Sequence, residues 1–192
     1  MPRPPIEDAR DRLLSAALNL FARRGTERVN SNAIARRARL GIGTFYTHFP
    51  DKHALLREIQ IRTVSGLRAA RVDALRGAGV RPVDQVRASV GAAIDFASGH
   101  AEAYRVTFGR ERAGAAAHGP VVTESSRPTA EALGRLQSAG RLDAALDVEL
   151  AARAYSAMEV GTILWWLEDS NRAARDALAD TLARMHPATA AS

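Results

Sequence analysis

The 192-residue sequence has no cysteine, few aromatic residues and a single lysine, Lys52. Without cysteine, the chain can form no disulfide, thiolate metal site or iron–sulfur cluster, and it has no cysteine nucleophile. Aromatic residues make up 5% of the chain, whereas alanine is abundant, and this composition favours helices over sheets.

Long apolar runs are also missing. Charged residues interrupt the apolar stretches every few positions, so we expect no helix that spans a membrane. The residues before Leu13 contain no apolar run of signal-peptide length. The sequence therefore predicts a cytoplasmic protein without a membrane partner.

Positive charge is concentrated in the first third of the chain. Residues 1–57 hold 11 basic and 5 acidic side chains, a net charge of +6, whereas residues 58–192 hold 16 of each. A basic head on a neutral body is typical of a module that binds nucleic acid. An anionic membrane or an acidic protein would also attract such a segment, and composition alone does not choose among these partners.

Apolar residues recur at helical spacing through most of the chain. The pattern predicts helices over 8–24, 31–38, 42–49, 52–76, 82–98, 100–112, 129–138, 147–168 and 172–185. A loop is expected at 113–119 and a frayed tail after the last helix. No alternating strand pattern is present, so the predicted fold class is all-α. It has about nine helices, with a three-helix head (residues 1–50) and a larger helical body (51–192).

Two short helices with a tight turn between them lie within the basic segment. This arrangement predicts a helix-turn-helix, whose second helix enters a DNA major groove about 12 Å wide. The small residues Gly43 and Thr44 at the start of that helix would let it approach closely. The apolar residues expected to anchor it in the core of the head are Phe21, Ile34, Leu40, Phe45 and Phe49.

The segment IARRARLGIGTFYTHFPDKHALL resembles the recognition-helix signature of TetR-type transcriptional regulators. The upstream LLSAALNLFARRG resembles the first helix of the same family, so the resemblance covers residues 9–57. It implies a transcriptional regulator, usually a repressor, that binds double-stranded DNA at a palindromic operator as a homodimer. It also implies a small-molecule effector that changes the spacing of the two heads. Here Arg39 stands where the family usually has a turn glycine, and Gly41 stands where it usually has a serine cap.

The resemblance also implies roles for individual residues. Thr44 would contact a phosphate or a base, Tyr46 and His48 would donate to phosphates, and Lys52 would pair with the DNA backbone. Ile42 and Thr47 would read the sequence. A helix N-terminus formed by Asn30, Ser31 and Asn32 could also face a phosphate. The full expected DNA-binding set is Asn30, Ser31, Asn32, Arg39, Ile42, Gly43, Thr44, Tyr46, Thr47, His48 and Lys52.

Plainer interpretations exist for several of these residues. Tyr46 could pack against the helix that begins at Lys52, and the arginines at 36, 37 and 39 could form a solvated face. His48 and His53 are separated by a helix break, so no metal site is expected. No cofactor is expected, and no nucleophile–base pair or phosphate loop indicates an enzyme. The main alternative is a helical interaction or ligand-binding protein of the same fold that does not recognise an operator.

In the body, aromatic and polar side chains could line an effector pocket or simply fill the core. The candidate pocket residues are Phe96, His100, Tyr104, Thr107, Phe108, Tyr155 and Glu159. The helix at 147–168 is apolar on several faces, and with the last helix it could form a two-fold contact between subunits. The candidate dimer residues are Leu150, Ala154, Ala157, Gly161, Leu164, Leu178 and Leu182. On this interpretation residues 51–192 form the effector-binding and dimerisation domain, and residues 1–50 form the DNA-binding domain.

Overall fold

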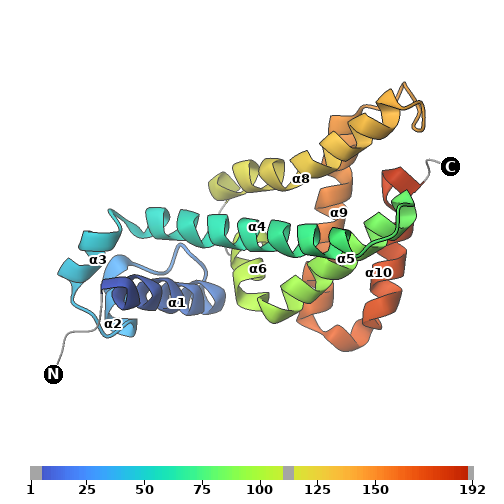
Figure 1. The fold of residues 1–192 in the computed structure, drawn as a ribbon. Coiled ribbons are helices and arrows are strands. Elements are labelled where there is room, and N and C mark those ends of the chain that lie inside the picture. Colours follow the sequence, from blue (N-terminus) through green and yellow to red (C-terminus); the bar gives the residue numbers. More distant parts are fainter. Residues whose placement is uncertain (1–5, 110–114, 190–192) are drawn as a thin grey trace. The chain divides into compact units, whose positions relative to one another are not determined.

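The computed structural model describes residues 6–109 and 115–189. Within them the chain forms nine α-helices, two short 3₁₀ helices and no strand, which confirms the all-α fold class (Figure 1). The α-helices are α1 (Ile6–Arg24), α2 (Ser31–Arg37), α3 (Ile42–His48), α4 (Lys52–Arg76), α5 (Pro82–Gly99), α6 (Ala101–Phe108), α8 (Ala115–Ser138), α9 (Val148–Glu168) and α10 (Arg175–Arg184). None of these helices is both long and apolar enough to cross a membrane.

The helices form two compact units. Among the described residues, 6–63, 102–109 and 115–118 form the first unit, and 64–101 and 119–189 form the second. Helices α1, α2 and α3 pack against one another in the first unit, and α4 begins there. The fully buried side chains at the centre of this unit include those of Phe21, Ile34 and Phe45, and Phe49 is 3% exposed. Leu40 packs against the same cluster but is only partly buried.

Local sequence signals set most of the helix ends. Gly25 ends α1 with a φ of 75°, a conformation that glycine adopts without steric cost. Asn30 caps α2 by accepting a hydrogen bond from the backbone N–H of Ala33 (2.9 Å), and Asp147 caps α9 in the same way through Leu150 (3.0 Å). Pro82 occupies the first turn of α5, where its missing N–H is not needed.

In the second unit, α10 lies against α5, and α9 also contacts α5. Arg175 of α10 pairs with Asp95 of α5 through two hydrogen bonds of 2.6 and 2.7 Å. The buried side chains of Val90, Ile94 and Leu182 belong to the core of this unit.

Three expectations about local structure need correction. The loop expected at 113–119 is helical from Ala115 onward, and residues 113–114 lie outside the described part of the chain. Helix α8 therefore begins well before the expected residue 129. The tail is not simply frayed, because residues Pro187–Thr189 form a 3₁₀ helix in which Ala188 is 4% exposed.

Candidate nucleic-acid interface

Helix α3 divides its side chains between the core and the surface. Phe45 is fully buried and Phe49, directly after the helix, is nearly so, and both hold α3 against α1 and α2. On the outer side, Tyr46 is 57% exposed and Ile42 is 37% exposed, and Gly43 and Thr47 are exposed as well. The expected sequence readers and the expected phosphate donor Tyr46 therefore share an open surface.

The polar groups of α3 differ in their partners. The ring of Tyr46 lies edge-on to Phe45 of the same helix, with 5.4 Å between ring centroids. Thr47 donates a hydrogen bond from its hydroxyl to the carbonyl oxygen of Gly43 (3.0 Å), so its methyl group is the part that is directed away from the helix backbone. Thr44 and His48 are half-buried. These residues remain predicted DNA contacts.

The start of α2 presents a second polar edge. Asn30 and Asn32 are exposed and Ser31 is half-buried. The side-chain oxygen of Asn30 accepts the capping bond from Ala33, so its amide nitrogen is the group that could donate to a phosphate.

The turn between α2 and α3 has an unusual backbone conformation at Arg39, where the family usually has a glycine. Arg39 has a φ of 57°, the only positive φ at a non-glycine residue in the described part of the chain. The N–H of Leu40 donates to the carbonyl oxygen of Ala35 (2.9 Å), which closes α2 as in a Schellman motif. Glycine normally occupies the left-handed position of this motif, and another residue there costs about 1–2 kcal/mol. Gly41, which replaces the usual serine, caps α3 without a side-chain hydrogen bond.

A side chain from α1 reaches this turn. The Arg12 guanidinium donates to the carbonyl oxygens of Ala38 (2.6 Å) and Arg39 (3.4 Å). These two carbonyls lie at the C-terminal end of α2, where backbone acceptors have no partner within the helix.

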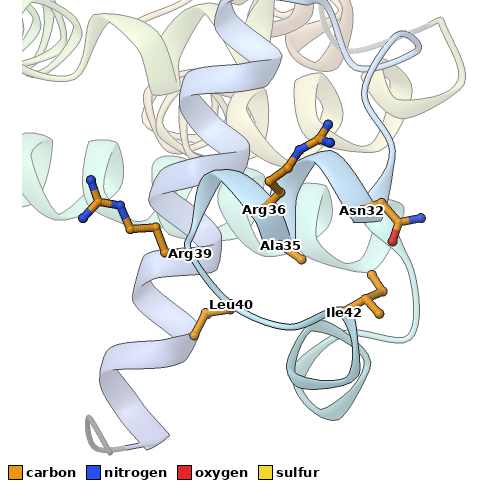
Figure 2. A pocket seen from close by; sticks show the side chains of 6 residues that line it. All are labelled: Asn32, Ala35, Arg36, Arg39, Leu40 and Ile42. Atoms are coloured by element: carbon orange, nitrogen blue, oxygen red, sulfur yellow. The ribbon is translucent and has the colours of Figure 1, made fainter. Parts of the chain in front are cut away.

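A shallow hollow lies between α2 and α3. Figure 2 shows Asn32 and Ile42 at one end of it and Arg39 and Leu40 at the other, and the Arg36 side chain projects outward from α2. Arg36 and Arg39 are exposed, and neither is paired with a carboxylate by any salt bridge found among the described residues. The hollow therefore combines positive charge with the polar and apolar edges that the helix-turn-helix presents.

Lys52 has a partner inside the first unit. Its ammonium donates to the backbone carbonyl oxygens of Thr26 (3.0 Å) and Glu27 (3.5 Å), in the loop after α1. The neighbouring Asp51 caps α4 through the N–H of Ala54 (2.7 Å), and this bond lowers the pKa of the Asp51 carboxyl. From the sequence we expected Lys52 to contact DNA only. Its bonds to the loop could not be predicted, because they depend on where that loop lies in the fold.

The expected pocket residues do not fall in one unit. Tyr104, Thr107 and Phe108 of α6 are buried in the first unit. Phe96 and His100, whose rings stack at 4.4 Å, lie in the second unit with the buried Tyr155 and Glu159. The effector pocket therefore remains a prediction, and its expected residues are divided between the two units.

Tyr155 and Glu159 belong to a largely buried polar cluster that the sequence did not reveal. Arg71 of α4 donates to Glu159 Oε2 of α9 (2.6 Å) and to the Ser89 hydroxyl of α5 (3.2 Å). The Tyr155 hydroxyl donates to the carbonyl oxygen of Leu182 (3.1 Å), and its ring lies 4.4 Å from that of His186. The signal that could have indicated this cluster is the position of Arg71, four residues after the buried Leu67 on the inward side of α4.

The expected dimer residues separate into two groups. Ala154, Ala157 and Gly161 are exposed along α9, and Leu150 and Trp165 on the same helix are 65% and 47% exposed. Leu164 is half-buried. Leu178 and Leu182 of α10, in contrast, are 5% and 1% exposed within the single chain. The expectation for these two leucines is corrected, because they pack inside the second unit, where α10 meets α5.

The short α2 and α3, their tight turn and the buried anchors of α3 define a helix-turn-helix within an all-helical protein. Residues 13–59 match the family model described as bacterial regulatory proteins, tetR family. The N-terminal part of the chain therefore matches the tetR family model, in agreement with the sequence motif, and the chain has the fold of solved tetR-family regulators.

Solved structures of several regulators share this fold. The fatty acid degradation regulator FadR from Bacillus halodurans aligns with a TM-score of 0.76 and 16% identity, over 96% of each chain. FadR from Bacillus subtilis, solved with stearoyl-CoA, gives the same TM-score and identity over 92% of this chain and 97% of that one. A tetR-family regulator from Streptomyces coelicolor is 24% identical with a TM-score of 0.66, over 96% of this chain and 79% of that one. No curated protein shows significant similarity to the chain.

Proposed function

We propose that the protein is a transcriptional regulator, and specifically a ligand-responsive repressor that binds a palindromic DNA operator as a homodimer. The observation that carries the DNA-binding part is the exposed polar edge of α3, which Phe45 and Phe49 anchor from beneath. The net charge of +6 on residues 1–57 supports the same conclusion, because it supplies attraction for phosphates where the helix-turn-helix lies.

Each residue of this edge has a proposed role. Tyr46 and His48 donate to phosphates, and Thr44 contacts a phosphate or a base. Ile42 and the methyl group of Thr47 meet base edges in the major groove, where apolar groups can distinguish the thymine methyl. Asn32, Arg36 and Arg39 around the hollow contact the backbone of the same half-site.

Dimerisation is part of the proposed mechanism, because one short helix-turn-helix makes few contacts. Two heads on a two-fold axis would engage half-sites about 34–36 Å apart, centre to centre. The exposed stripe of α9, formed by Leu150, Ala154, Ala157, Gly161 and Trp165, supports a contact between subunits, because its small residues allow helices to approach closely.

The effector is proposed on family grounds, and the fold likeness does not identify it. Stearoyl-CoA is a suitable first probe because it is bound in the Bacillus subtilis FadR structure. An effector should raise the melting temperature of the protein and release it from DNA. A panel in which no compound does either would remove the ligand-responsive part of the proposal and leave the DNA-binding part standing.

Salt dependence tests the DNA-binding proposal. Affinity for duplex DNA, measured by fluorescence anisotropy, should fall by about 10³-fold or more between 50 and 200 mM salt if six to ten phosphates are contacted. Absence of measurable duplex binding at 50 mM salt would favour the alternative of an interaction protein with the same fold.

A further inference from the structure

We infer that Arg12 is a positioning residue for DNA recognition, which holds the turn between α2 and α3 in the left-handed conformation that glycine would adopt unaided. This inference rests on the proposed function and adds to it a residue outside the expected DNA-binding set. The observation behind it is the pair of hydrogen bonds from Arg12 to the carbonyl oxygens of Ala38 and Arg39.

The turn needs support because an arginine, and not a glycine, occupies its left-handed position. Arg39 has a φ of 57°, and a Cβ atom at that φ crowds the following carbonyl. A residue with a side chain therefore tends to leave this conformation for the ordinary helical or extended region. That change would break the bond between Leu40 N–H and Ala35 O, which fixes where the chain leaves α2.

Arg12 opposes this change because its long side chain carries a planar guanidinium group with several N–H donors. Its guanidinium comes from the middle of α1, which Leu13 and Ala17 bury in the core of the first unit. Because α1 is fixed there, the two hydrogen bonds tie the end of α2 to a rigid support. Arg12 thus compensates, from a distant position in the sequence, for the absence of a glycine at position 39.

The direction in which α3 leaves the turn decides whether Ile42 and Tyr46 meet DNA. Arg12 reaches the backbone carbonyls of the turn, so its effect on affinity acts through α3 and adds no phosphate contact of its own. This distinguishes it from Arg39, whose exposed side chain is proposed to contact DNA directly.

A double-mutant cycle tests the inference, with Arg12→Ala, Arg39→Gly and the double variant compared on one duplex. We expect Arg12→Ala to weaken binding by about tenfold in the wild-type background and by less than about threefold when glycine occupies position 39. Arg12→Lys, which retains a donor, should restore part of the loss. Arg184→Ala, which removes an exposed arginine from α10, is the matched control and should bind as the wild type does.

The salt dependence separates positioning from direct contact. A residue that touches a phosphate lowers the slope of log affinity against log salt by about 1 when it is removed, whereas a positioning residue leaves the slope unchanged. Equal effects of Arg12→Ala in the two backgrounds, or a reduced slope, would overturn the inference.

Hydrogen exchange gives a readout that needs no DNA. The Leu40 amide, bonded to Ala35 O, should exchange faster in Arg12→Ala than in the wild type, and Arg39→Gly should restore its protection in the double variant. If exchange follows this pattern but no duplex binds, the proposed function fails while the role of Arg12 in the turn stands. Unchanged exchange in Arg12→Ala would overturn the role in the turn, whatever the protein does with DNA.

Discussion

The ammonium of Lys52 lies 3.0 Å from the backbone carbonyl oxygen of Thr26. This hydrogen bond joins the first residue of α4 to the loop that follows α1. Thr26 itself is 4% exposed, and its carbonyl oxygen also accepts a bond from the Val29 N–H (3.4 Å), so Lys52 adds a second donor to a buried residue of this loop. The only lysine of the chain therefore stabilises the loop between α1 and α2. Its position at the start of α4 also suits a phosphate contact.

Replacing Lys52 should affect both stability and binding. Lys52→Met keeps the length of the side chain but removes its donors, so the free energy of unfolding should fall by about 1 kcal/mol. The melting temperature and the DNA affinity should decrease together, and Lys52→Arg should restore both. Normal stability in Lys52→Met would show that the bonds to the loop contribute little.

Tyr46→Phe should affect DNA binding without affecting the fold. The ring keeps its contact with Phe45, whereas the hydroxyl that is proposed to donate to a phosphate is lost. A hydrogen bond to a charged acceptor is worth about 1.5–3 kcal/mol, so affinity should fall by roughly tenfold or more, for every DNA sequence alike. Wild-type affinity in this variant would show that Tyr46 does not contact the backbone.

Gly161→Arg should abolish dimers and operator binding. Gly161 is exposed, and a Cβ built on it meets no atom within 4 Å, so the single chain has room for a side chain there. A bulky cation would instead prevent the close approach of a second α9. Sedimentation should therefore report monomers. Gly99→Arg, at an equally open glycine at the end of α5, is the matched control and should remain dimeric. A Gly161→Arg dimer that still binds DNA would refute the proposed contact.

The stability of the protein should decrease in mild acid through His186. Burial, and then the positive charge of Arg71, lowers the pKa of His186 from 6.5 to about 4. Its Nδ1 also accepts a hydrogen bond from the Ala188 N–H (3.1 Å), which requires that nitrogen to be unprotonated. The unfolded chain takes up the proton near pH 6.5 and the folded chain only near pH 4. The contribution of His186 to the free energy of unfolding is therefore fully present above pH 6.5 and is lost as the pH drops toward 4.

The matched variant is His186→Asn, which keeps a side-chain acceptor but does not titrate. The melting temperature of the wild type should fall between pH 7 and pH 5 by a few degrees more than that of His186→Asn. Parallel pH profiles for the two proteins would contradict the assignment.

The sequence predicted the fold well where local signals decide the structure. Asn30, Pro82 and Asp147 act within one turn of their own positions, so the starts of α2, α5 and α9 lie within a residue of the expected ones. The sequence also drew attention to Arg39, because it stands where the family usually has a turn glycine, but it did not establish the conformation of that residue. The start of α8 was missed, since the alanines and glycines at 113–119 do not distinguish a helix from a loop.

Features that depend on contacts between distant residues were not predicted. The pairing of Arg71 with Glu159 joins α4 to α9 through two residues that are 88 positions apart, and the bond from Arg12 to Ala38 needs the packing of α1 against α2. Leu178 and Leu182 show the same limit, because an apolar stripe identifies a buried face but does not say whether the same chain or another covers it.

Selection of bound duplexes from a random DNA pool tests the central claim most directly. We predict enrichment of a palindrome whose half-sites are one helical turn apart, about 34–36 Å. We also predict that substitutions at Thr47 change the enriched half-site, whereas Tyr46→Phe only weakens binding. Enrichment of no sequence, or of the same site by every Thr47 variant, would contradict the assignment of α3 as the helix that reads DNA.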